Sequence, residues 1–176
     1  MIMKRSVSKG LTVAAVIILI CIAFVGFLFL NGSIGIAPEK LEADIRSSQK
    51  ITDDWIVEGS VCDSMAAYIS YPADKSDCTF SVYVKHDDLL SFGYFFRSGG
   101  SIYEIEEYIA EHTVEGNDER AFISMNRQKV ARLEVNNGIS VEVTEIDSDK
   151  PFAIVLPMNA GSITFYDING KAVEYY

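Results

Sequence analysis

An uninterrupted apolar run near the start of the chain limits what the sequence can fold into. Residues 11–30 (LTVAAVIILICIAFVGFLFL) hold 20 residues without a charge. An α-helix of that length is about 30 Å long, which matches the hydrocarbon core of a bilayer. A cleaved secretory signal has a shorter apolar centre of about 7 to 15 residues, and few soluble core helices are apolar on every side. We therefore expect a transmembrane signal anchor over residues 11–30, in preference to a cleaved signal or a buried helix.

Basic residues before this run predict its orientation. Lys4, Arg5 and Lys9 lie in residues 1–10, which contain no carboxylate. Positive charge flanking an apolar helix favours the cytoplasmic side. We expect residues 1–10 to be a cytoplasmic basic tail of a single-pass cell-membrane protein, and residues 31–176 to lie outside the cell.

The rest of the chain is strongly acidic. Residues 31–176 carry 12 basic and 25 acidic side chains, a net charge of −13, whereas the whole chain carries −10. Such a surface repels phosphate backbones and offers no basic stripe. Nucleic acid is therefore not an expected partner. The expected partners are membrane lipid, through residues 11–30, and an envelope protein.

The stretch Lys9-Gly10-Leu11-Thr12 resembles the start of a type IV prepilin, in which a peptidase cuts after a glycine. The resemblance implies a filament subunit whose apolar helix forms the filament core. Prepilins have a glutamate at the fifth position after the cut, where this chain has Ala15. A pilin helix also continues into its head, whereas residues 31–38 are rich in residues that end helices.

We expect residues 31–37 to form a hinge and residues 38–52 an amphipathic juxtamembrane helix. Pro38 suits the first turn of a helix, because its missing N–H has no partner there in any case. Leu41 and Ile45 are four residues apart and would share one face.

Residues 53–176 have the composition of a mainly-β, β-rich α+β extracytoplasmic domain. Short runs rich in Val, Ile, Tyr, Phe and Thr alternate with turn residues, and Asn-Gly pairs mark two tight hairpins. We expect antiparallel hairpins in a sandwich-like or open sheet, with one or two short helices. The expected hairpins pair residues 64–71 with 78–84, 129–135 with 139–146, and 162–168 with 171–176, and further strands are expected at 90–97 and 152–156.

Residues 102–114 fit two alternatives. Ile102, Ile105 and Ile109 would share a helix face, which we favour. A strand that turns at residues 115–118 and pairs with the next apolar run fits the pattern too.

The aromatic stretch at residues 92–97 alternates Phe92, Tyr94 and Phe96 with Gly93, Phe95 and Arg97. A strand that is apolar on both faces is typical of a sheet centre. We expect this strand to be central and to pack in the core.

Cys62 and Cys78 are the candidate disulfide partners in the outer domain. If the first hairpin turns at residues 72–77, Cys62 lies nine residues beyond the point opposite Cys78, or about 30 Å away. A disulfide requires Cα atoms within about 7 Å. We expect two free thiols, unless the chain bends sharply before Met65.

Chemistry-bearing motifs are scarce. The sequence contains no G-x-S-x-G, H-E-x-x-H, C-x-x-C or Walker loop. His86 and His112 are the two histidines, and both are expected at the surface. A Cys-His pair of His86 with Cys62 or Cys78 is the catalytic alternative, without a family signature around either cysteine.

Asp147, Asp149 and Asp167 are the candidate calcium ligands. Calcium takes six to eight oxygen ligands, and these short stretches lack the remaining ligands of an EF-hand. Turn formation explains the aspartates more simply. We expect no resident metal or cofactor and no catalytic residues.

These observations favour a membrane-anchored cell-envelope protein whose outer domain is a non-catalytic interaction or accessory module. An envelope-polymer hydrolase is the first alternative, and a pilin-like filament subunit is the second.

Overall fold

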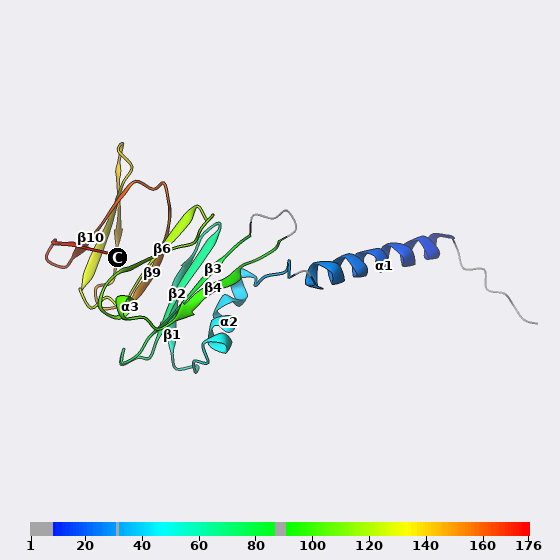
Figure 1. The fold of residues 1–176 in the computed structure, drawn as a ribbon, viewed down its shortest axis with the longest axis horizontal. Coiled ribbons are helices and arrows are strands. Elements are labelled where there is room, and N and C mark those ends of the chain that lie inside the picture. The colour runs from blue at the N-terminus through cyan, green and yellow to red at the C-terminus, as the bar shows by residue number, and fades with distance from the viewer. Residues whose placement is uncertain (1–8, 31, 87–90) are drawn as a thin grey trace, which may run out of the picture.

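The computed structural model describes residues 9–30, 32–86 and 91–176. Helix α1 (Lys9–Leu30) extends away from the rest of the molecule (Figure 1). Its segment Gly10–Leu30 is, among the described helices, the one that is long and apolar enough to cross a membrane, and it is almost entirely exposed. This arrangement fits a signal anchor or a signal peptide.

The remaining elements form a β-rich domain with short helices. A 3-10 turn (Pro38–Lys40) leads into α2, and α3 lies between the fourth and fifth strands. The bounds of the helices are α2 Leu41–Ser48 and α3 Tyr103–Glu107. The strands are β1 Ile56–Val61, β2 Met65–Tyr71, β3 Thr79–Val84, β4 Phe95–Gly100, β5 Ala110–Thr113, β6 Glu119–Ser124, β7 Val130–Asn136, β8 Val141–Glu145, β9 Phe152–Pro157, β10 Ser162–Asp167 and β11 Ala172–Val173.

The strands make three open antiparallel sheets. Their orders are β1-β2-β3-β4, β5-β6-β9 and β11-β10-β7-β8. Figure 1 shows the sheets as successive layers, with the first nearest α1 and the sheet that contains β10 at the far end of the domain. We call them the first, middle and last sheets.

The middle sheet is apolar on both faces because it lies between the other two. Ala121 and Ile123 of β6 pack in the core shared with the first sheet. Phe122, which points the opposite way, packs in the core shared with the last sheet. β9 repeats this division with Val155 on one side and Phe152 on the other. Alternate side chains of a strand point to opposite faces, so each strand supplies both cores.

Helix α2 covers the outer face of the first sheet. Leu41 and Ile45 are fully buried there against Ala66, Tyr83 and Tyr94. The expectation of a shared apolar face is confirmed, although the helix ends at Ser48 and is therefore shorter than residues 38–52. The helix thus packs as a layer of the domain.

The three predicted hairpins are confirmed. β2 pairs with β3, β7 with β8, and β10 with β11, all antiparallel. β9 confirms the run at residues 152–156. For residues 102–114, each of the two alternative predictions is correct in part. Residues 103–107 form the helix α3, and residues 110–113 form the strand β5.

The aromatic strand is displaced from its predicted position, and the prediction that it is central is wrong. β4 begins at Phe95, and it forms the edge of the first sheet beside β3. Phe92 and Phe96 are 56% and 49% exposed, whereas Tyr94 is buried. Position 90 lies outside the described residues. Apolar side chains on both faces of a strand therefore do not show whether the strand is at the centre or at the edge of its sheet.

Replacing Phe122 by alanine tests the two-sided packing of the middle sheet. Phe122 is fully buried, and its ring centroid lies 5.3 Å from that of Phe165. Truncation leaves a cavity between two sheets, so we expect Phe122→Ala to lower the free energy of unfolding by about 3–5 kcal/mol. Urea unfolding of the full chain in detergent, followed by circular dichroism, measures the loss.

Ile139→Ala is the matched control, because the side chain of Ile139 is 96% exposed. We expect it to change the free energy of unfolding by less than about 0.5 kcal/mol. Equal losses in the two variants would contradict the layered packing.

Candidate functional site

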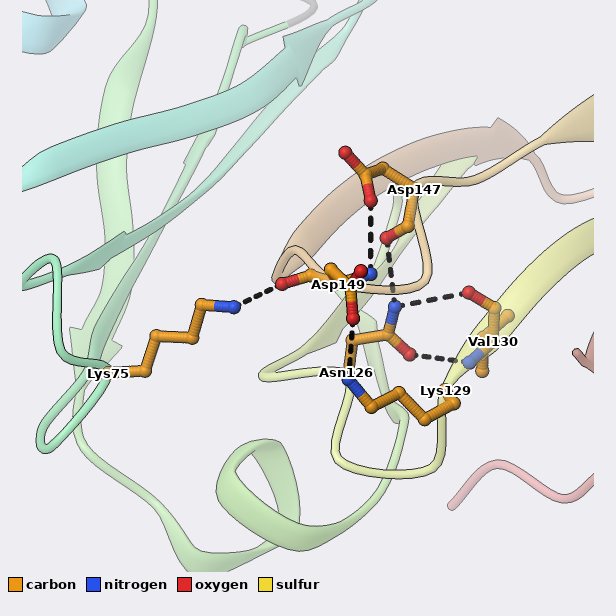
Figure 2. Close-up of polar contacts among 6 residues, drawn as sticks. All are labelled: Lys75, Asn126, Lys129, Val130, Asp147 and Asp149. Atoms are coloured by element: carbon orange, nitrogen blue, oxygen red, sulfur yellow. Dashed lines mark hydrogen bonds and ion pairs between the residues drawn. The ribbon is translucent and has the colours of Figure 1, made fainter.

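The candidate calcium ligands Asp147 and Asp149 lie in one loop, between β8 and β9 (Figure 2). The Asp147 carboxylate accepts a hydrogen bond from the backbone N–H of Asp149 at 3.0 Å. The Asp149 carboxylate lies 2.7 Å from the Lys129 ammonium, and the Lys75 ammonium donates to the backbone carbonyl of Asp149. Lysine side chains therefore occupy the positions from which a cation would approach this loop.

Asn126 fixes the same loop from inside the domain. Its buried side-chain amide donates to the carbonyls of Val130 at 3.1 Å and Asp147 at 3.2 Å, and its oxygen accepts the Val130 N–H at 2.7 Å. Asn126 has a φ of 56°, a left-handed conformation that asparagine tolerates better than most residues. A buried amide with these partners holds the loop in place (Figure 2).

The pKa values of the Asp149 and Asp167 carboxyl groups are lowered by their immediate neighbours. A hydrogen bond from Lys129 and its positive charge lower the pKa of Asp149. Asp167 is the last residue of β10, and the N–H groups of Lys171 and Asn169 in the following turn lower its pKa. Among the described residues, no group of three or more His, Cys, Asp or Glu side chains could hold a metal ion. Asp147 and Asp167 accept N–H groups of their own turns, whereas the Asp149 carboxylate pairs with Lys129.

Cys62 and Cys78 are free thiols in the structure. Burial and the nearby charges of Glu106 and Asp77 raise the pKa of Cys78 to about 11. Burial also raises the pKa of Cys62. A protonated thiol is a poor nucleophile, so neither cysteine is activated for chemistry.

His86 is stacked on an aromatic ring, in contrast to the Cys-His pair considered from the sequence. Its ring centroid lies 4.2 Å from that of Phe95, and the two rings are nearly parallel. His86 is exposed and therefore lies at the surface, as expected.

His112 instead meets a serine that the sequence did not indicate. Nε2 of His112, on β5, lies 2.8 Å from Oγ of Ser98, on β4. Burial, with the charge of Arg97, lowers the pKa of His112, so the imidazole is neutral at pH 7. His112 is half-buried, and the expectation of a surface residue is wrong. Ser98 precedes two glycines, and no motif in the sequence marks it as a nucleophile.

The Ser98–His112 pair lacks the other parts of a nucleophilic site. Within the described residues, no carboxylate forms a hydrogen bond with the His112 ring to orient it. A hollow of about 330 Å³ lies beside Arg97, and its walls include His86 and Val114 but neither Ser98 nor His112. A serine and a neutral imidazole therefore meet at the edges of two sheets, and the hollow beside Arg97 does not reach them.

A larger groove of about 630 Å³ lies between β1, the end of β8 and the start of β9. The charged side chains that line it are Glu58, Glu145, Asp147 and Lys150, so carboxylates exceed ammonium groups. Such a groove favours positively charged ligands.

Strand β8 borders this groove and is the terminal strand of the last sheet. All five of its residues are exposed, including Val141 and Val143 at 51% each. Ile139, in the preceding turn, is 96% exposed. Within the described part of the chain, β8 pairs with β7 alone, which leaves its outer edge open to another strand.

The burial of His112 and the nearby charge of Arg97 predict a pH dependence of stability. The pKa of His112 is lowered on folding, so below about pH 6.5 the unfolded chain binds a proton that the folded chain excludes. The contribution of His112 to the free energy of unfolding is complete above pH 6.5, and it is lost as the pH falls through the pKa of His112 in the folded chain. We expect the stability advantage of the native chain over His112→Gln to shrink between pH 8 and pH 5, as measured by urea unfolding.

His86→Gln is the control for this measurement, because it removes an exposed histidine instead. A stability difference between the native chain and His112→Gln that stays constant over this pH range would contradict the assignment of a half-buried, neutral His112.

Comparisons of the chain with known protein families, with curated proteins and with solved structures find no match.

Proposed function

We propose that the chain is a single-pass protein of the cell envelope, with its N-terminus in the cytoplasm and its β-rich domain outside. The domain acts as a non-catalytic interaction module. The apolar side chains of α1, which are exposed apart from Leu28, and the basic residues that precede the helix support the anchoring. The filament hypothesis rests only on the residues around Gly10, because α1 ends at Leu30 and does not continue into the domain.

The observation that carries the interaction role is the open edge of β8. An exposed edge presents unpaired N–H and C=O groups that can accept a strand from another chain. Val141 and Val143 project from one side of β8 and are half-exposed, although β-branched apolar side chains usually pack against a neighbour. An added strand would cover both valines and continue the sheet.

Charge indicates what kind of strand β8 would accept. Glu142 and Glu145 lie on β8 itself, and Glu58 and Asp147 line the adjoining groove. The outer part of the chain as a whole carries a net charge of −13. Opposite charges steer and orient association, whereas a second copy of this domain would be repelled. The expected partner is an extended segment with Lys or Arg side chains.

Site-specific photocrosslinking of the full-length protein in its native membrane tests this role. A photoreactive phenylalanine analogue in place of Val143 should give a discrete adduct of higher mass, because the partner strand lies beside it. Electrophoresis and mass spectrometry of the adduct identify the partner and its Lys and Arg content.

The same analogue in place of Ile168 is the matched control, because Ile168 is 61% exposed in a turn that does not belong to β8. We expect no discrete adduct there. The same adduct from both positions, or none from position 143, would argue against β8 as the docking edge.

An envelope-polymer hydrolase is the second candidate, and the 2.8 Å contact of Ser98 with His112 favours it. A fluorophosphonate probe reacts with serines that a neighbouring base activates. The His112 ring lacks a carboxylate partner among the described residues. We therefore expect the probe to label the native chain no more than the Ser98→Ala variant. Labelling at Ser98 would favour the hydrolase over the interaction module.

A further inference from the structure

Two backbone hydrogen bonds close the C-terminal end of α1. The N–H of Gly32 donates to the carbonyl of Phe29 at 3.1 Å, and the N–H of Ser33 donates to that of Leu28 at 2.9 Å. These contacts cap the C-terminal end of the helix. The region from residue 32 to 37, which follows this cap, is here called the connector.

The connector is paired with the segment before β4. Ile36 and Tyr94 exchange two backbone hydrogen bonds of 2.8 Å each. Phe92 donates to the carbonyl of Ser33 at 2.9 Å and accepts from the N–H of Gly35 at 2.6 Å. Four backbone hydrogen bonds thus join the connector to the domain, where the sequence predicted a hinge.

Two glycines allow this close approach. A Cβ atom at Gly35 would lie 2.7 Å from the carbonyl oxygen of Tyr94, and one at Gly93 would lie 2.7 Å from that of Ile36. Gly93 also has a φ of +86°, which side chains rarely tolerate. Gly35 therefore serves close packing, although a glycine at this place in the sequence suggested flexibility.

The segment that receives the connector is fixed inside the domain. Tyr94 is 1% exposed, and its hydroxyl donates to the backbone carbonyl of Cys62. Tyr94 also packs in the cluster that contains Leu41 and Ile45 of α2. The end of α1 is consequently linked to the core through a short, hydrogen-bonded path.

Apolar side chains project from this junction into solvent. Ile34 is 45% exposed, and Phe92, which it faces across a β-bridge, is 56% exposed. Phe29 and Leu30, at the end of α1, are 74% and 85% exposed. Four exposed apolar side chains thus occur at the end of α1 and at the bridge that begins four residues after it.

We propose that Ile34 and Phe92 insert into the interfacial layer of the bilayer at the point where α1 leaves it. This inference rests on the proposed anchoring by α1. The occupant is lipid because Ile34 follows Leu30 by only four residues, at most about 14 Å of extended chain, and the turn at Ser33 shortens that distance. The polar layer on each side of the hydrocarbon core is about 5–8 Å thick.

Seating of the domain on the membrane gives β8 a defined position. The last sheet lies at the end of the domain farthest from α1 (Figure 1). With the junction held at the lipid surface, this end faces away from the membrane. The open edge of β8 is then presented to the outer compartment in a constant orientation.

Tryptophan quenching by brominated lipid tests the insertion. The chain has one tryptophan, so Trp55→Phe provides a background without indole fluorescence. Phe92→Trp in that background places a reporter at the junction, and Ile139→Trp places the control in the β7–β8 turn. Both full-length variants are reconstituted in phosphatidylcholine vesicles with or without bromine on the upper acyl chain.

We expect brominated lipid to reduce the emission of the Phe92→Trp variant at least twofold and to leave the Ile139→Trp variant unchanged. Ile34→Trp is a second reporter, should Phe92→Trp disturb the connector, and it should be quenched in the same way. Protein that floats with the vesicles but shows no quenching at position 92 or 34 overturns the insertion alone. Protein that does not float with the vesicles overturns the proposed anchoring itself.

Discussion

Burial of the middle sheet on both faces is the constraint on which the rest of the domain depends. The first and last sheets do not share a core, and each buries its apolar face against β6 and β9. Sheets with one apolar face need a second layer to cover it, and a three-stranded sheet between two others provides this cover twice. The opposed side chains of Ala121 and Phe122 therefore connect two hydrophobic cores through a single strand.

A buried carboxylate fixes the position of the first sheet on the middle sheet. Glu119, at the start of β6, accepts hydrogen bonds from the backbone N–H groups of Ser64 at 2.9 Å and Met65 at 2.7 Å, and from the hydroxyl of Ser64 at 2.9 Å. Hydrophobic contact alone would let the first sheet slide over the middle one. A carboxylate that meets several donors of the β1–β2 turn selects one register, because any shift leaves a buried charge without partners.

Local patterns in the sequence predicted hairpins well and did not predict how the hairpins assemble. The Asn-Gly turns and the alternation in residues 78–84 depend on neighbours in the chain, and those predictions are confirmed. The assignment of strands to three sheets depends on contacts between distant segments. Ser98 and His112 meet for that reason only, at the edges of two sheets. The glycines in residues 31–37 were ambiguous, because packing and flexibility both require a residue without a side chain.

The two open features of the molecule are at opposite ends, and this separation connects structure to function. The junction with Ile34 and Phe92 lies beside α1, whereas β8 belongs to the last sheet. An interaction module on a flexible tether samples many orientations, so its binding edge meets a fixed envelope partner only part of the time. A connector with four backbone hydrogen bonds removes that freedom before any partner arrives. The entropy of orienting the edge is then lost on folding, so the strand addition that we propose at β8 needs only a weak contact.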